Sequence, residues 1–219
     1  MMTMTRPWLI FSSSTGQTFR AFHSALDKEA KAALQGFFTD RPCAAAGIAR
    51  QELESAPVYE LDKKEFEAFV LAWIEKKQLK DGVILLCGFF GILSADFLER
   101  CPFPILNTHP SMLPAFPGLD HKVQRLAWST VPVSGFSVHM VTPELDGGAI
   151  VFQQPVAIDP RWSEEESRRA VRSAEQKWLP RVWQSVIRSR ISKDDLKLTS
   201  QELRLKHEFF EFGFQEKTI

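Results

Sequence analysis

Residues 83–90 read V-I-L-L-C-G-F-F, a continuous apolar run. A strand with one face in water alternates apolar and polar side chains, whereas a strand covered on both faces is apolar throughout. The run therefore predicts a buried strand of a mostly parallel sheet, with helices packed on both faces of that sheet.

Strand-like and helix-like segments alternate around this run. The clearest helix is predicted for residues 64–77, where Phe66, Val70, Trp73 and Ile74 share one face and charged residues occupy the other. This alternation is typical of a doubly wound α/β sheet, a Rossmann-like fold. Further strands are predicted at residues 8–11, 34–39, 58–61 and 104–107, and further helices at 17–34, 44–52 and 95–100.

The second half of the chain predicts a different local arrangement. Residues 135–142 and 149–158 alternate apolar and polar side chains, which predicts two hairpin-like strands. Ser163, with Glu166 three residues on, predicts the start of a long helix that ends near Ser189. We expect one catalytic domain over residues 1–190, with residues 191–219 packing on it as a tail. A helix at 120–129 is also predicted, and L-K-L-T and F-F-E-F-G-F are candidate strands in the tail.

The composition limits the classes of partner. The chain has 219 residues, of which 44% are hydrophobic and 25% charged, and 27 basic residues balance 27 acidic ones. Long nucleic acids are bound through a surplus of basic residues, so we expect no nucleic acid partner. The apolar run before Ser12 is too short for a signal peptide or a membrane span, and three cysteines without metal-type spacing suit a reducing compartment. We therefore expect a cytoplasmic monomer or homodimer that acts on small molecules, without membrane contact.

Three polar clusters follow predicted strands, where open α/β sheets bind their ligands. The first, S-S-S-T-G-Q-T at residues 12–18, offers hydroxyl groups and a helix N-terminus to an anion. The second, N-T-H, places Asn107 and His109 on one face of an extended chain. The third, P-E-L-D-G-G at residues 143–148, adds Asp146. An amide, an imidazole and a carboxylate together fit acyl transfer to a nucleophile that the substrate itself brings.

Each cluster also has a purely structural interpretation. The serine-rich loop can be a capping loop, Asn107 and His109 can satisfy buried backbone groups, and Asp-Gly-Gly is a common turn between strands. A serine hydrolase is not indicated, because the chain lacks a G-x-S-x-G elbow. His109, His121 and His139 could in principle ligate a metal, but neither an HExxH motif nor a cysteine pair supports this, and we expect no metal.

Two longer motifs distinguish between these interpretations. N-T-H-P-S-M-L-P-A-F-P-G-L starts at Asn107, and G-F-S-V-H-M-V-T-P-E-L-D-G-G-A-I starts at Gly135. Together they resemble the folate-dependent formyltransferase family, over roughly residues 8–186. Within that family, P-G-L after L-P is similar to the branch whose acceptor is glycinamide ribonucleotide, an intermediate of purine biosynthesis.

The resemblance implies one-carbon chemistry at a defined site. A formyl group would pass from 10-formyltetrahydrofolate to an amine by direct attack, through an oxyanion intermediate. Asn107 and His109 would hydrogen-bond the oxyanion. Asp146 would orient His109 or an ordered water, and would help to take the proton that the amine loses. Ser137 and His139 would support these residues. The folate would contact Phe89, Phe90, Gly91, Ile92, Leu93, Val141, Thr142, Glu144 and Leu145, with Phe97 and Leu98 near its benzoate part.

The resemblance also implies an acceptor site, in which a phosphate and a ribose are bound by the first loop and the long helix. The first loop has fewer glycines than is usual in the ribonucleotide branch, and Gly91 stands where that branch commonly has an arginine. The alternatives are a formyltransferase for another amine, such as an amino sugar nucleotide, and a non-catalytic folate- or nucleotide-binding protein. For the two charged helix residues the alternative is a solvated helix face. The implied acceptor residues are Ser13, Ser14, Thr15, Gly16, Gln17, Thr18 and Arg172 for the phosphate and Glu175 for the ribose hydroxyls.

Overall fold

The computed structural model describes residues 5–118 and 131–207, and within them the strands form one sheet. The order across the sheet is β3-β2-β1-β4-β5-β6-β7. The first five strands in this order, β3, β2, β1, β4 and β5, are parallel to one another. Strand β6 is antiparallel to β5, and β7 is antiparallel to β6. The strands are β1 (Trp8–Phe11), β2 (Leu34–Thr39), β3 (Val58–Glu60), β4 (Val83–Leu86), β5 (Ile105–His109), β6 (Val133–Met140) and β7 (Ile150–Ala157).

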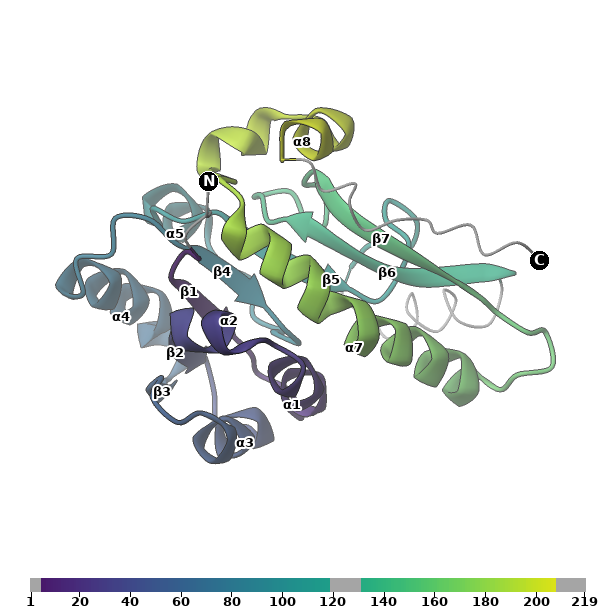
Figure 1. The fold of residues 1–219 in the computed structure, drawn as a ribbon, viewed down its shortest axis with the longest axis horizontal. Coiled ribbons are helices and arrows are strands. Elements are labelled where there is room, and N and C mark those ends of the chain that lie inside the picture. The colour runs from purple at the N-terminus through teal and green to yellow at the C-terminus, as the bar shows by residue number, and fades with distance from the viewer. Residues whose placement is uncertain (1–4, 119–130, 208–219) are drawn as a thin grey trace.

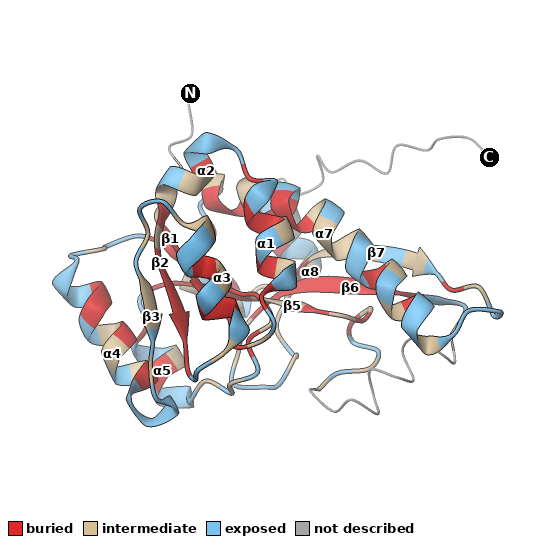
Figure 2. Cartoon of the chain, turned by 90° about the horizontal axis from the view of Figure 1, so that it is seen from below, coloured by how far each residue is buried: buried red, intermediate tan, exposed pale blue. Residues whose placement is uncertain are grey.

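Helices cover both faces of the sheet, as the apolar strands predict. In β1, Trp8 and Ile10 belong to one buried cluster, and Leu9 and Phe11 belong to the other. Figure 2 shows β1, β2 and β6 buried and the helices exposed on their outer sides, whereas β3 and β7 are mostly of intermediate burial. The fold class predicted from the sequence is therefore confirmed. The helices are α1 (Gln17–Ser24), α2 (Lys28–Ala33), α3 (Ala44–Glu52), α4 (Lys63–Lys76), α5 (Ala95–Arg100), α7 (Glu164–Arg188) and α8 (Ser200–His207), with a short 3-10 helix η1 (Lys193–Lys197).

The long helix α7 lies across one face of the sheet (Figure 1) and contacts α1, β6 and β7. Its start is fixed by a capping box: Ser163 N–H donates to Glu166 Oε2 at 2.8 Å, and Glu166 N–H donates to Ser163 Oγ at 3.3 Å. This confirms the predicted helix start. Its apolar side, which includes Val171, Leu179 and Trp183, is buried against the sheet.

Several predicted boundaries are wrong. The predicted helix at residues 17–34 is divided into α1 and α2, because the Asp27 side chain accepts the Ala30 N–H at 2.8 Å and starts a new helix. The predicted strand at 83–90 pairs only through Leu86, and Gly88 then takes a φ of 62°. The L-K-L-T segment is not a strand: its first two residues end η1, and its last two join η1 to α8. The predicted helix at 120–129, His121 and the F-F-E-F-G-F segment lie outside the described residues.

The described part of the tail contacts the rest of the chain at several points. Lys193 Nζ donates to the carbonyl oxygens of Leu98, Glu99 and Cys101 at 2.7–2.8 Å, at the end of α5. Ser200 Oγ accepts the N–H of Ile150 at 2.8 Å. Among the helices at residues 5–118 and 131–207, none combines the length and the apolar character needed to cross a bilayer.

The strand order places one crevice at the centre of the sheet. From β1 the chain crosses outward to β2 and β3, and then returns to the other side of β1 to form β4 and β5. In such sheets the ligand-binding crevice opens outside the carboxyl ends of the two strands at this switch point. The loops after β1 and β4, together with the end of β5, therefore meet at one edge of the sheet.

Candidate active site

A cleft of about 840 Å³ lies at this switch point. Its walls come from the loop after β1, residues 88–90 after β4, residues 107–110 at the end of β5, and the first half of α7. A smaller cavity of about 130 Å³ shares Phe89 and Asn107 with the cleft. Two of the three polar clusters predicted from the sequence therefore line one cleft, and the third, which contains Asp146, lines the adjoining cavity.

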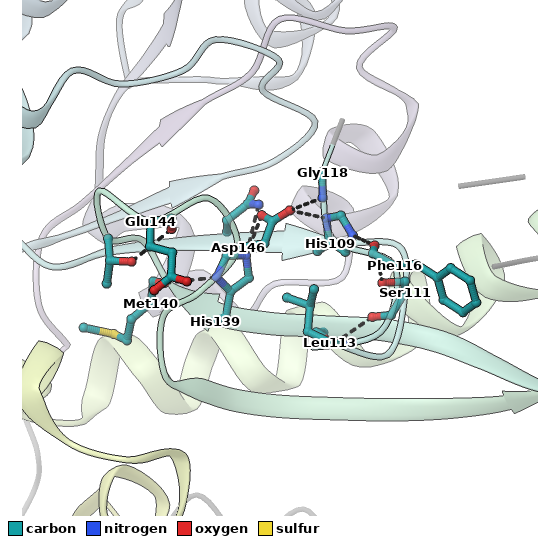
Figure 3. Close-up of polar contacts among 12 residues, drawn as sticks. His109, Ser111, Leu113, Phe116, Gly118, His139, Met140, Glu144 and Asp146 are labelled. Atoms are coloured by element: carbon teal, nitrogen blue, oxygen red, sulfur yellow. Dashed lines mark hydrogen bonds and ion pairs between the residues drawn. The ribbon is translucent and has the colours of Figure 1, made fainter. Parts of the chain in front are cut away.

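The three predicted catalytic side chains converge beside this cleft. The Asp146 carboxylate lies with Oδ2 at 3.5 Å from His109 Nδ1 and Oδ1 at 3.5 Å from His139 Nε2. Asn107 Nδ2 lies 3.2 Å from His139 Nε2. Figure 3 shows Asp146 between the two imidazole rings. An amide, two imidazoles and a carboxylate are thus in mutual contact, although Asp146 is 37 residues beyond His109 in the chain.

A backbone N–H group holds the Asp146 carboxylate in place beside the two histidines. Its Oδ2 accepts the N–H of Gly118 at 2.7 Å, and its side chain is 5% exposed. Its backbone takes a φ of 53°, a left-handed conformation that Asp adopts more readily than most residues. The D-G-G segment therefore forms the predicted turn and also directs its carboxylate into the site.

The hydrogen bonds of His139 define its neutral form. Its Nδ1 lies 3.0 Å from the carbonyl oxygen of Met140, so Nδ1 carries the hydrogen and Nε2 is free to accept one from the Asn107 amide. Burial lowers the pKa of His139, although the Asp146 carboxylate opposes this effect. A neutral His139 thus fixes the orientation of the Asn107 amide group and leaves its second N–H for another acceptor.

His109 is also held on both sides. Its Nε2 lies 2.9 Å from the carbonyl oxygen of Phe116, so this nitrogen donates, while Nδ1 faces Asp146. Phe116 and Gly118 both have positive φ, of 57° and 100°. This short loop therefore contacts His109 through a carbonyl group and Asp146 through an N–H group.

Ser137, predicted as a supporting residue, acts on the same loop. Its hydroxyl donates to Ser111 O at 2.7 Å and accepts from Leu113 N at 3.0 Å. Gln153 Nε2 donates to Ser137 Oγ at 2.9 Å and to Leu113 O at 2.7 Å. Ser137 and Gln153 thus tie the loop after β5 to β6 and β7, and the loop in turn holds His109.

The predicted folate residues surround the smaller cavity. Gly91, Ile92, Leu93, Val141, Thr142, Glu144 and Leu145 all line it, together with Phe89 and Leu98. Ile92 and Leu145 are 72% and 53% exposed, so apolar surface is available at its rim. Phe90 lines the larger cleft instead. Phe97, which we expected near the benzoate part, is fully buried against Phe11 and does not line the cavity.

The first loop is only partly available to a ligand. Ser14, Thr15, Gln17 and Thr18 line the cleft. The Ser13 hydroxyl accepts the Phe90 N–H at 2.8 Å, and Ser13 is not among the lining residues. Gly16 starts α1 with a φ of 75°, and a Cβ there would lie 2.8 Å from Ala45 Cα. Ser13 and Gly16 therefore shape the loop, and direct contact of either with a ligand stays a prediction.

Arg172 and Glu175 line the opposite wall, on α7. Burial raises the pKa of Glu175, opposed by a hydrogen bond from the Thr108 side chain and by the charge of Arg172. The sequence did not single out Thr108, nor three further residues of α7 that line the cleft, Glu164, Glu165 and Arg168. A capped helix with charged residues at spacings of three and four was the only sequence signal for these positions.

Other residues of the site were also missed. The carbonyl of Phe116, the N–H of Gly118 and the side chain of Gln153 carry no chemical signal in the sequence, because their role depends on the folded loop. Among the described residues, no group of three His, Cys, Asp or Glu side chains is placed to hold a metal ion.

A comparison with known families defines the class of protein. The sequence profile of the family described as "Formyl transferase" matches residues 7–183, which is most of the chain. The chain therefore belongs to the formyl transferase family, as the two motifs predict. It is a folate-dependent formyltransferase, and its co-substrate is 10-formyltetrahydrofolate.

Individual relatives carry more specific names. The chain is 33% identical to the phosphoribosylglycinamide formyltransferase of Bacillus subtilis, over 81% of this chain and 92% of the relative. The crystal structure of glycinamide ribonucleotide transformylase 1 from Geobacillus kaustophilus superposes with a TM-score of 0.72 and 25% identity, covering 84% of this chain and 99% of the other. The phosphoribosylglycinamide formyltransferase of Anaplasma phagocytophilum, at a TM-score of 0.73 and 22% identity over 87% of this chain and 91% of the other, shares the fold.

Proposed function

We propose that this enzyme transfers the formyl group of 10-formyltetrahydrofolate to the amine of glycinamide ribonucleotide, a step of purine biosynthesis. The relatives with this activity in their names support the proposal, since they match along nearly their whole length. The observation that carries the proposal is the shared cleft. The amide and imidazole suited to formyl chemistry border the same space as Arg172, Glu175 and the hydroxyl-rich first loop.

The transfer follows from the groups around Asp146. The amine nitrogen of the acceptor attacks the formyl carbon, a new C–N bond forms, and the carbonyl electron pair moves onto oxygen. The second N–H of Asn107 donates to this oxyanion. His109 Nε2–H also donates to the oxyanion, after its hydrogen bond to the Phe116 carbonyl breaks. The Asn107 amide is already oriented by His139, so this donor needs little reorganisation when the charge develops.

Asp146 manages the proton in this scheme. The attacking nitrogen carries one proton too many after the new bond forms, and the Asp146 carboxylate takes it, directly or through a water molecule. When the oxyanion collapses, the bond between the carbon and N10 of the folate breaks, and the proton passes to N10. The position of Asp146 supports this role, because Asp146 and Asn107 line the same smaller cavity.

The two halves of the acceptor would bind opposite walls. A phosphate suits the hydroxyl groups of Ser14, Thr15 and Thr18 and the guanidinium of Arg172. The ribose hydroxyls suit the carboxylate oxygens of Glu175. The folate would occupy the smaller cavity, with its ring system against residues 89–93 and 141–145.

The organisation of the whole chain is part of the proposal. Residues 1–190 form the catalytic domain, and residues 191–219 are a tail that packs on it, which the contacts of Lys193 and Ser200 support. The protein acts in the cytoplasm as a monomer or homodimer on small molecules, without nucleic acid.

Steady-state assays test this function. The purified chain is mixed with 10-formyltetrahydrofolate and glycinamide ribonucleotide, and release of the deformylated folate is followed by absorbance. We expect turnover that depends on the ribonucleotide. Turnover with an amino sugar nucleotide but not with glycinamide ribonucleotide would contradict the proposed acceptor, and folate binding without turnover on any amine would contradict catalysis.

A further inference from the structure

Thr108 stands between two proposed catalytic residues but belongs to the opposite face of the sheet. In β5, Leu106 lies in the buried cluster under α7, whereas Ile105 lies in the cluster on the other face. Side chains alternate along a strand, so Thr108 shares the face of Leu106, and Asn107 and His109 share the face of Ile105. The pairing of Thr108 with Val138, which also packs under α7, agrees with this direction.

Glu175 lies on α7, the helix that packs on the sheet face to which Thr108 belongs. Thr108 and Glu175 line the same large cleft, so the Thr108 hydroxyl and the Glu175 carboxyl group border one space. Cys87, at the end of the neighbouring strand β4, is fully buried close enough to Glu175 for the carboxylate charge to raise the pKa of its thiol. Burial also raises the pKa of Glu175, so its position is a costly place for an unpaired charge.

We infer that Thr108 is a positioning residue for the acceptor, whose hydroxyl donates to the Glu175 carboxylate and fixes it toward the sugar hydroxyls in the cleft. The inference rests on the proposed function and deepens it. Because Asn107 and His109 are the immediate neighbours of Thr108, one strand end holds the oxyanion donors on one face and the acceptor's anchor on the other. Acceptor and formyl group are thereby aligned by a single rigid element.

The inferred hydrogen bond also favours the ionised form of Glu175. Burial favours the neutral acid, and the Thr108 hydroxyl and Arg172 favour the carboxylate, which is the better acceptor for sugar hydroxyls. Strand β7 has no titratable residue, and His139 of β6 lies beside Asn107. On α1, His23 has its pKa lowered by burial and by Lys31. The remaining titratable groups that line the cleft are His109, Glu164, Glu165 and Arg168, and Cys87 is buried near Glu175.

The experiment compares T108V, which removes the hydroxyl at nearly constant shape, with T108S, which keeps it. The KM for glycinamide ribonucleotide, the KM for 10-formyltetrahydrofolate and kcat are measured across pH. We expect T108V to raise the KM for the ribonucleotide by about tenfold, the usual effect of losing a hydrogen bond to a charged group. The acidic limb of the T108V pH profile should move to higher pH, because Glu175 binds a proton more readily without the hydroxyl. T108S should resemble the wild type, and the KM for the folate should not change.

A double-mutant comparison separates this role from a general structural one. If Thr108 acts through Glu175, T108V has no further effect on the KM of an E175Q enzyme. The matched control is T39V, another buried strand threonine, whose hydroxyl bonds to Arg41 O at 2.7 Å outside the cleft. T39V should keep the wild-type KM. If T108V does not fold, T108A takes its place with the same expectations.

The outcomes are distinguishable. A wild-type KM and pH profile in T108V, or a further rise in KM when T108V is added to E175Q, would overturn the inference and leave the proposed function intact. Absence of turnover with glycinamide ribonucleotide in the wild type would overturn the proposed function and the inference together.

Discussion

The proposed catalytic cluster and the proposed acceptor wall border the same cleft but are built differently. In the cluster, the side chains of His109, His139 and Asp146 are nearly buried, Asn107 is half-buried, and all four contact one another or backbone groups. On the wall, Glu165 and Arg172 of α7 are exposed, Glu175 is half-buried, and Arg168 forms an ion pair with Glu165. The difference suggests that the chemistry is preorganised, whereas recognition of the acceptor uses side chains that adapt when it binds.

The largest effect is expected when the centre of the cluster is changed. D146N keeps the size of the side chain but removes the negative charge that accepts the proton, so transfer should fall by about a thousandfold. Folate affinity should stay within a few-fold of the wild-type value, because the predicted folate-binding residues do not include Asp146. Stopped-flow kinetics and a folate binding titration measure the two quantities.

The control for this variant is D159N, which changes a carboxylate paired with Arg161 away from the cleft. It should keep wild-type kcat. Normal turnover by D146N would show that the carboxylate does not take the proton.

A smaller loss is expected from the oxyanion donor. N107A removes one N–H donor and should lower kcat by roughly a hundredfold, about 3 kcal/mol of transition-state stabilisation. The KM for both substrates should change little, because the hydrogen bond strengthens only as charge develops. The matched control, Q35A, removes an amide that bonds to Ala33 O outside the site. An N107A enzyme that loses affinity but keeps kcat would assign Asn107 to ground-state binding.

The sequence predicts those parts of the arrangement that depend on local patterns, and it does not predict contacts between segments that are far apart in the chain. The strand and helix alternation predicted the sheet, and the motifs predicted Asn107, His109 and Asp146, because each lies in a local pattern with chemical content. Phe116, Gly118 and Gln153 could not be predicted, since they act through backbone groups or through packing between β6, β7 and the loop after β5. The division of the first predicted helix at Asp27 was missed because helical spacing continues across a cap.

On the acceptor wall, we predict that replacing Glu175 by glutamine stabilises the folded chain but weakens binding of the acceptor. The pKa of Glu175 in the folded state lies above its ordinary value of 4.5. Its stabilising contribution is therefore fully present below the unfolded-state pKa and is lost as pH rises through the folded-state pKa. E175Q removes this loss, so we expect it to melt at a higher temperature than the wild type at pH 8, with a smaller difference at pH 5.

The same variant should raise the KM for the acceptor by about tenfold, since an amide is a weaker acceptor than a carboxylate. Calorimetry at the two pH values and steady-state kinetics provide the measurements. A lower melting temperature at pH 8 would mean that the ionised carboxylate stabilises the folded chain, contrary to this explanation.

The most direct test is a crystal structure of the protein with glycinamide ribonucleotide and a non-reactive analogue of 10-formyltetrahydrofolate. We predict a phosphate beside Ser14–Thr18 and Arg172, with the formyl oxygen of the analogue within hydrogen-bonding distance of Asn107 Nδ2 and the amine of the acceptor facing the formyl carbon. Density for the ribonucleotide elsewhere on the surface, or a formyl group directed away from Asn107 and Asp146, would contradict the account.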